Sequence, residues 1–244
     1  MRMTVLAKRC AKEILRDPIN LGFGLGFPLI LLGLLSAIQA NIPVRMFEIE
    51  RLAPGVAVFG LSFMTLFSAT LISKDRESAF LQRLYASPLT AADFLGGYML
   101  PVLLIAAGQT AVCLLFALPL GLKASVSMVS MVIGCLPAAA FHVSLGLLLG
   151  SVLGVKQVGG ICGALLTNVS GWMSGVWFDL ELVGEGFSRV ARMLPYYHAV
   201  KLAEALLGGR FEAAAGHLLP VMGYCAVTGV IAGVVFCRQM KRKQ

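Results

Sequence analysis

The chain has 244 residues, of which 58% are hydrophobic and only 13% are charged. An ordinary soluble domain carries about 25% charged residues, so a soluble globular enzyme is excluded. Intrinsic disorder is excluded too, because disordered chains contain few apolar residues. The net charge of +8 would suit nucleic acid in a soluble protein, but here the basic residues flank apolar runs, a pattern typical of membrane proteins.

The first segment, residues 1–17, is predicted to form a basic amphipathic helix. Its apolar residues recur at helical spacing, and its bases lie mostly on the other side; the apolar set is Met3, Leu6, Cys10 and Ile14. A helix of this kind lies in the membrane interface. Two acidic residues and a long following apolar run argue against a signal peptide.

Six stretches without Asp, Glu, Lys or Arg are long enough to cross a bilayer, which takes roughly 20 residues. The predicted spans are residues 19–38, 52–73, 94–122, 124–155, 157–178 and 213–237. Bends are expected at Pro101, Pro119 and Pro137. The sequence therefore predicts a single all-α polytopic membrane domain over residues 1–244, with six spans and both termini on one side.

The distribution of charge predicts the orientation of these spans. Thirteen of the 20 Lys and Arg residues fall on the side that holds both termini. The positive-inside rule then places the N- and C-termini in the cytoplasm. The six cysteines show no CxxC spacing, so we expect free thiols that pack as small hydrophobes.

Two of the predicted spans carry side chains that suit a substrate pathway. In the second span Phe59, Phe63 and Phe67 repeat every four residues and form one stripe. The fifth span is unusually polar and aromatic, with Asn168 and Trp172. Together they are predicted to line a path for an aromatic or amphipathic molecule; the alternative is lipid-facing Phe and an interhelical Asn bond.

The predicted cytoplasmic loop, residues 74–93, is longer than a turn between spans requires. Phe80, Leu81, Leu84 and Tyr85 would form one apolar helical face. Ser87-Pro88 ends this helix, and Thr90 or Ser87 caps the next one, with Asp93 completing a capping box for Thr90. Such a short amphipathic helix suits a groove on another protein; the alternative is a connector lying on the membrane.

The segment 179–212, before the last span, is too short for a domain and too apolar for a free loop. It is predicted to form short helices that enter the outer leaflet, with Tyr196 and Tyr197 at the interface.

Several chemistries are absent from the sequence. There is no phosphate-binding Gly-x-x-x-x-Gly-Lys motif and no His-Glu-x-x-His zinc motif, so we expect no metal and no cofactor in this chain. An intramembrane serine hydrolase is the rival of another class. However, His142 and Ser144 are two residues apart, about 200° around a helix, and would not meet. Charged residues are missing from all six runs, which disfavours a proton-driven carrier.

The stretch from Asp75 to Thr90 resembles the region between spans two and three of ABC-2 type permeases, the membrane subunits of ATP-driven exporters. The basic amphipathic start, the six-span layout and Leu194-Pro195-Tyr196-Tyr197 before the last span are similar as well. The sequence departs from the family at Ala79-Phe80, where Gly-Thr is usual.

This resemblance implies a permease without catalytic activity in the bacterial cytoplasmic membrane. Two permease subunits, identical or different, would pair, and each would dock on a separate nucleotide-binding ATPase that holds ATP and Mg. The implied ATPase-coupling residues are Glu77, Arg83, Leu84, Ser87 and Pro88, and the implied outer gate is Pro195, Tyr196 and Tyr197. The uncharged spans favour export of a hydrophobic drug, peptide or lipid-like molecule; export of a polysaccharide or glycolipid is the alternative.

Overall fold

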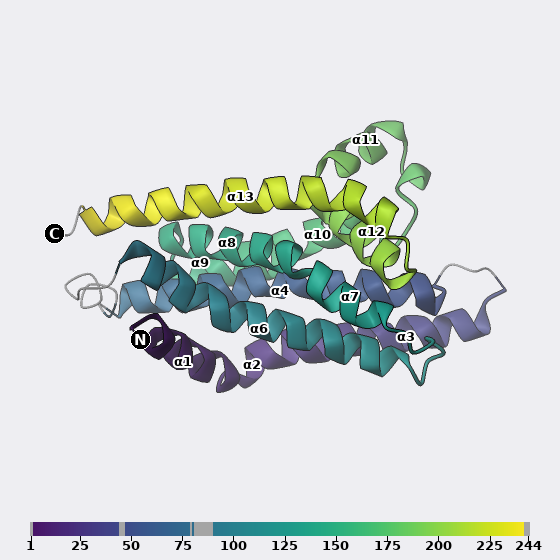
Figure 1. Ribbon diagram of the computed structural model, residues 1–244, viewed down its shortest axis with the longest axis horizontal. Helices are drawn as coiled ribbons and strands as arrows, with labels where there is room; N and C mark the ends of the chain where they lie inside the picture. The colour runs from purple at the N-terminus through teal and green to yellow at the C-terminus, as the bar shows by residue number, and fades with distance from the viewer. Residues whose placement is uncertain (1, 44–46, 79, 81–89, 242–244) are drawn as a thin grey trace.

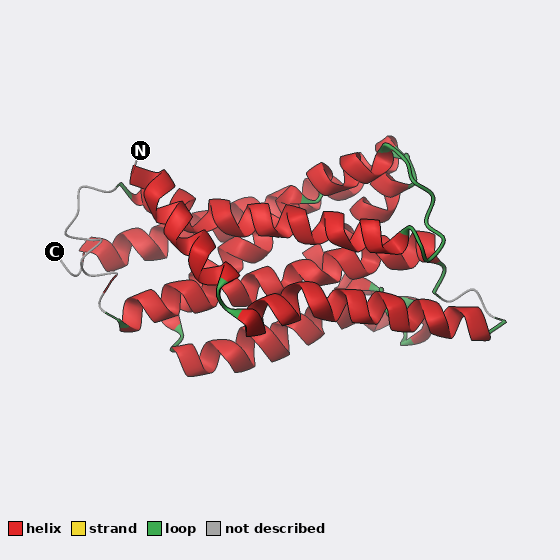
Figure 2. Cartoon of the chain, turned by 90° about the horizontal axis from the view of Figure 1, so that it is seen from below, coloured by secondary structure: helices red, strands yellow, loops and turns green. Residues whose placement is uncertain are grey.

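The computed structural model describes residues 2–43, 47–78, 80 and 90–241, and every element in this part of the chain is a helix (Figure 2). The elements are α1 (Arg2–Leu15), α2 (Pro18–Leu21), η1 (Gly22–Gly26), α3 (Phe27–Asn41), α4 (Ile49–Glu77), α6 (Ala91–Ala117), α7 (Ser127–Gly134), α8 (Leu136–Val152), α9 (Val155–Val158), η2 (Gly159–Leu165), α10 (Leu166–Ser174), η3 (Leu180–Leu182), α11 (Glu185–Met193), α12 (Pro195–Leu207) and α13 (Phe211–Lys241). The all-α prediction is confirmed, and both chain ends lie at the same end of the bundle (Figure 1). We call this the terminal end.

Five helices in the described residues are long and apolar enough to cross a membrane. They are Pro18–Asn41, Ile49–Glu77, Ala92–Ala117, Ser127–Val152 and Phe211–Gln239. The predicted fifth span, residues 157–178, is not among them. This part of the chain is helical only from Val155 to Ser174, and the stretch Gly159–Leu165 within it, η2, is a π-helix. The polar residues of this segment reduce its hydropathy. The six-span layout and its orientation across the membrane therefore remain predictions.

Helix α4 is the centre of the bundle. Within its most apolar stretch 89% of the residues are buried, compared with 17% for the first candidate span and 11% for α13. It packs most closely on α8, where a Cβ at Gly146 would overlap the backbone oxygen of Thr65, and one at Gly150 would overlap that of Ala69. Small residues at this four-residue spacing let two helix backbones approach closely.

The proline bends fall partly as predicted. A turn at Cys135, two residues before Pro137, separates α7 from α8, and Pro119 lies in the turn that ends α6. Pro101 stays inside α6. The candidate span Ser127–Val152 is therefore two helices joined at one turn.

Helix α1 runs obliquely across the ends of the other helices (Figure 2). Its apolar residues Leu6, Cys10 and Ile14 are at most 5% exposed, because they pack on the protein. Gly96 and Gly97 of α6 give the space for this contact. The bundle itself therefore covers this apolar face, and the position of α1 in the membrane interface remains a prediction.

At the other end, α12 is built into the bundle and does not form a loose loop. Its buried residues include Val200, Leu202 and Ala203, and it packs against α4, α7 and α13. Helix α11 projects from this end (Figure 1). All six cysteines are free thiols, as predicted.

Candidate functional site

Three consecutive ionisable residues, Asp75, Arg76 and Glu77, end α4 at the base of the predicted loop. Each contacts a different part of the bundle. We call these three residues and their partners the loop base.

Asp75 forms the buried centre of the loop base and is 1% exposed. Both its carboxylate oxygens accept from the Arg9 guanidinium, with Nη2 to Oδ1 at 2.5 Å, and the Tyr98 hydroxyl also donates to it. Such a bidentate, charge-assisted contact is among the strongest hydrogen bonds in proteins. The hydrogen bond with Asp75 raises the pKa of Arg9 above its ordinary value.

Arg9 itself has two further contacts. It pairs with Glu13 one turn along α1, at 2.9 Å, and its guanidinium carbon lies 4.1 Å from the centre of the Phe80 ring. The side chain is therefore held from three directions. This fixes α1 to the ends of α4 and α6.

Arg76 and Glu77 form hydrogen bonds with the backbone at the junction between α8 and α9. Arg76 donates to the carbonyls of Ser151 and Leu153, the second at 2.5 Å, which places a cation at the C-terminal end of α8. The Glu77 Oε1 accepts from the backbone N–H of Val155 at 2.9 Å, at the start of α9. Both placements complement the helix dipoles.

The last helix joins the same junction. The Gln239 amide of α13 donates to the Ser151 carbonyl at 2.9 Å, and Lys74 lies 3.5 Å from Asp17, just before α2. Four helices, α1, α6, α8 and α9, are thus bonded to one turn of α4, and α13 is bonded to α8 beside it. A displacement of this turn would reach α1, α6, α8, α9 and α13 together.

The other predicted coupling residues, Arg83, Leu84, Ser87 and Pro88, lie outside the described residues. The far end of the loop is described. Thr90 accepts from the Asp93 N–H at 3.1 Å, and its own N–H donates to the Asp93 carboxylate at 3.2 Å. This is the predicted capping box, and α6 starts directly after it.

The predicted pathway residues of α4 face the protein interior. Phe59, Phe63 and Phe67 are 6%, 4% and 1% exposed. They do not face lipid: the first candidate span covers them, with Phe27 in ring contact with both Phe59 and Phe63, at centroid distances of 6.3 and 5.9 Å.

The predicted pathway residues of α10 lie elsewhere. Asn168 is exposed and donates to the Ala164 carbonyl of its own helix at 2.8 Å, so it makes no interhelical bond there. Trp172, one turn further, is 51% exposed. The opposite face contacts α4, since a Cβ at Gly171 would lie 3.2 Å from the Phe59 ring. The structure therefore does not bring the two predicted sets together within one chain.

The predicted gate residues form the first turn of α12. Pro195 begins the helix. Tyr196 is buried, with its ring centre 5.9 Å from that of Phe141, and burial raises its pKa. Tyr197 lies beside a histidine pair, His198 and His217, whose Nδ1 atoms are 3.0 Å apart. These three residues therefore stand where α12 meets α8 and α13.

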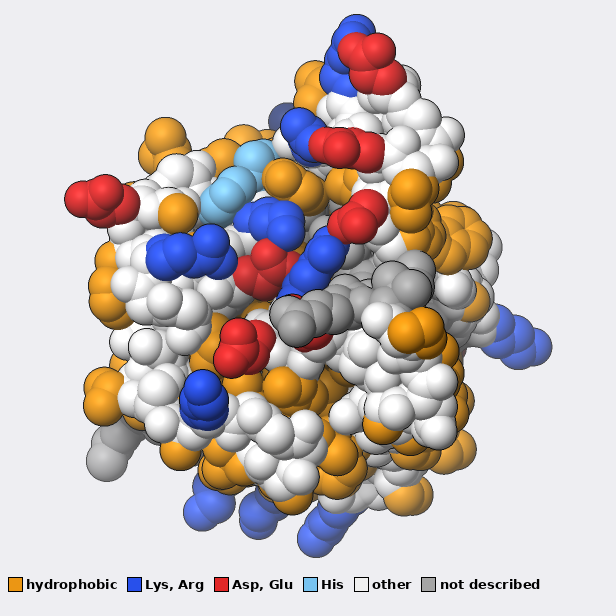
Figure 3. Space-filling view, turned by 90° about the vertical axis from the view of Figure 1, so that its right-hand side faces the viewer, with side chains coloured by type: hydrophobic (Ala, Val, Ile, Leu, Met, Phe, Trp, Pro, Cys, Tyr) orange, Lys and Arg blue, Asp and Glu red, His pale blue; other side chains and the backbone are white. Residues whose placement is uncertain are grey.

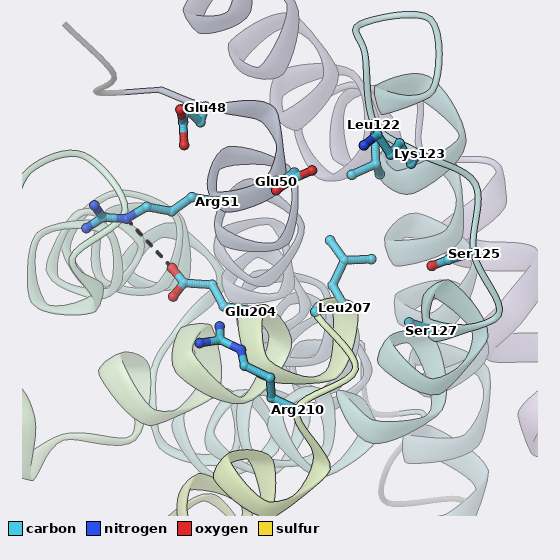
Figure 4. A pocket seen from close by; sticks show the side chains of 11 residues that line it. Glu48, Glu50, Arg51, Leu122, Lys123, Ser125, Ser127, Glu204, Leu207 and Arg210 are labelled. Carbon is cyan, nitrogen blue, oxygen red and sulfur yellow. Dashed lines mark ion pairs between the residues drawn. The ribbon is translucent and has the colours of Figure 1, made fainter.

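A charged hollow at the end opposite the termini was missed by the sequence analysis. Side chains of both signs gather on this face (Figure 3). The hollow holds about 560 Å³ between the start of α4, the 122–127 turn and the end of α12 (Figure 4). Arg51 lies 2.5 Å from Asp179 and 3.9 Å from Glu204, and it holds the pKa of Asp179 below its usual range.

The sequence analysis also missed Arg9 and Tyr98. The only signal was an acidic residue, Asp75, directly following a long apolar run, where a charge needs a partner. Nothing in the sequence identifies which residue that partner is.

Comparison with known proteins assigns the chain to a family. The model of the ABC-2 type transporter family matches residues 1–207. The chain belongs to the ABC-2 type transporter family. A relative, ycf38 of Cyanophora paradoxa, is classed by its name as a transport permease and is 35% identical over 92 residues. The alignment covers 36% of this chain and 32% of the relative, so the match spans about a third of that protein.

Membership and the five long apolar helices make this chain a multi-pass membrane protein of a transporter family. In this ABC-2 protein His142 and Ser144, the residues weighed for a serine hydrolase, make no hydrogen bond with each other. His142 contacts Thr65, with Nδ1 to Oγ1 at 3.1 Å, while Ser144 Oγ has no hydrogen-bond partner among the described residues. Within those same residues, no three His, Cys, Asp or Glu side chains group closely enough to hold a metal ion.

Proposed function

We propose that this chain is the permease subunit of an ATP-driven exporter for a hydrophobic or amphipathic molecule. A separate ATPase subunit, carrying ATP and Mg, docks on the loop between Glu77 and Thr90. Movement of that loop drives the spans between inward- and outward-open states. Nucleotide drives this change because it binds the two states with different affinity.

The loop base is the observation that supports this proposal. The loop leaves α4 at Glu77 and returns at the Thr90 capping box. One end is tied by side chains to four other helices, through Asp75, Arg76 and Glu77. A force applied to the loop is therefore spread over the bundle and does not bend a single helix.

The exposed face of the fifth helical segment supports pairing with a second permease. Gly160, Ala164, Asn168 and Trp172 follow one another at four-residue spacing, and all are exposed. Small residues allow close helix approach, and an amide facing hydrocarbon is unfavourable without a partner. We propose that a second copy covers this face and that Asn168 and Trp172 line the substrate path between the copies. The Phe59 stripe then forms the wall behind α10.

Reconstitution with the partner ATPase tests the proposal. We expect the purified chain alone to hydrolyse no ATP. Glu77→Ala should reduce ATP-driven transport at least tenfold while insertion stays intact, because the acceptor for the Val155 N–H is lost. Glu77→Gln is the matched control, since its amide oxygen retains that acceptor. Full transport by Glu77→Ala, or transport without any ATPase, would contradict the proposal.

The pairing face is tested separately. Asn168→Leu should reduce the dimer fraction and transport, whereas Leu104→Ala, exposed on α6 away from this segment, serves as the control. The dimer fraction is measured by cross-linking in native membranes. A dimer fraction unchanged in Asn168→Leu would place the second copy elsewhere.

A further inference from the structure

The outward face of α1 combines exposed bulky hydrophobic residues with exposed bases. Val5 and Leu15 are 71% and 59% exposed, and Ile19, just after Pro18, is 70% exposed. Three exposed bases, Lys8, Lys12 and Arg16, alternate with these hydrophobic residues along the same side. The apolar face that would normally seat such a helix in lipid is already packed on the bundle, so this is a second, separate surface.

A hollow of about 610 Å³ lies on this face. Its lining is Val5, Lys8, Arg9, Lys12, Glu13 and Arg16. Glu13 is paired with Arg9, which is also bound to Asp75. Among the described residues no ion pair is formed by the three exposed bases of this face. Three of the four bases that line the hollow are therefore without an ion-pair partner among the described residues.

We propose that this hollow binds the headgroup of an anionic phospholipid, with the acyl chains running along Val5, Leu15 and Ile19. The three bases supply the charge that a phosphate requires. The exposed hydrophobic residues would be unfavourable in water and fit the upper acyl region of a bilayer. Helix α1 leads directly into the first candidate span, Pro18–Asn41, so the hollow lies at the level of the headgroups.

A soluble phosphate would account for the bases of this surface but not for its hydrophobic residues. It would bind the bases and leave Val5, Leu15 and Ile19 in water. A basic cluster next to a span with adjacent apolar residues is typical of anionic-lipid binding. Arg9 connects the bound lipid to the loop base, because its side chain lines the hollow and is hydrogen-bonded to Asp75. Anionic lipid therefore stabilises the attachment of α1 to the loop base.

Binding to the full chain in neutral detergent micelles tests the site. A fluorescent phosphatidylglycerol is titrated against wild type, against Lys8→Gln/Lys12→Gln/Arg16→Gln, and against a control with three bases replaced at the opposite end, Lys123→Gln/Arg189→Gln/Arg210→Gln. Each base near an anionic surface contributes roughly a fivefold factor, so the first variant should bind about a hundredfold more weakly. The control should stay within about twofold of wild type.

Competition experiments distinguish the sources of the phosphate. Unlabelled phosphatidylglycerol should displace the probe, while phosphatidylcholine and glycerol phosphate should not. Protection of Cys10 from alkylation shows that α1 is still packed in each variant, because its thiol is buried. Equal binding by the first variant with Cys10 protected overturns the proposal. So does equal competition by phosphatidylcholine, which would mean no charge selectivity, or by glycerol phosphate, which would indicate a soluble ligand.

Discussion

The contact between Arg9 and Asp75 should dominate the stability of the terminal end. The Asp75 side chain is 2% exposed and that of Arg9 is 35% exposed. Arg9→Met leaves a buried carboxylate with only the Tyr98 hydroxyl as a donor, and loss of one partner of a buried pair destabilises by about 3–5 kcal/mol. Asp75→Asn is milder, about 1.5–3 kcal/mol, because Arg9 reaches water and still pairs with Glu13.

A double-mutant cycle makes this expectation quantitative. Since Arg9→Met/Asp75→Asn removes both charges together, its loss should be smaller than the sum of the single losses by about 0.5–3 kcal/mol. Tyr98→Phe removes one donor to the buried carboxylate and should cost about 1.5–3 kcal/mol, less than Arg9→Met. The free energy of unfolding is measured by circular dichroism as sodium dodecyl sulfate is added to neutral micelles.

Two results would refute this reasoning. A loss below about 1 kcal/mol for Arg9→Met would mean that Asp75 finds another partner or is not buried. Strict additivity in the double variant would mean that the two side chains do not interact. Either result would also remove the physical link between α1 and the loop base.

Three further predictions concern packing, pH and reactivity. Gly146→Ala should destabilise the chain by about 1–3 kcal/mol, because the added methyl overlaps α4; Gly108→Ala, with open space around it, should not, and equal unfolding curves for the two would disprove the close contact. Arg51 lowers the folded pKa of Asp179, so their contact stabilises the chain above about pH 4 and is lost below it, by at most about 1 kcal/mol; a pH series of melting temperatures should show this acid loss in wild type and not in Asp179→Asn, and matching series would contradict it. Burial raises the pKa of the Cys10 thiol to about 12, so iodoacetamide at pH 8 should leave it unmodified, as read by peptide mass spectrometry, and rapid alkylation in the folded chain would show that α1 detaches.

Local features of the sequence predicted much of the helical architecture. The apolar runs predicted five of the candidate spans, because a bilayer requires about 20 apolar residues per crossing. The Thr90 capping box and the break near Pro137 were also predicted, since each depends on residues within a few positions of one another. The fifth run, residues 157–178, is not among the candidate spans of the structure, because its polar residues reduce its hydropathy.

The partners of side chains could not be predicted. Arg9 is 66 residues from Asp75, and Tyr98 is 23 residues from it. The sequence around Asn168 did not indicate whether its side chain faces the bundle or the outside. Periodicity shows which residues share a helix face, but only packing decides what that face meets. For this protein the sequence alone determined a helical membrane chain with a long loop. Tertiary structure decided that α1, α6, α8 and α9 are bonded to the end of α4 at the base of that loop, because a buried carboxylate is stable only where distant donors converge on it.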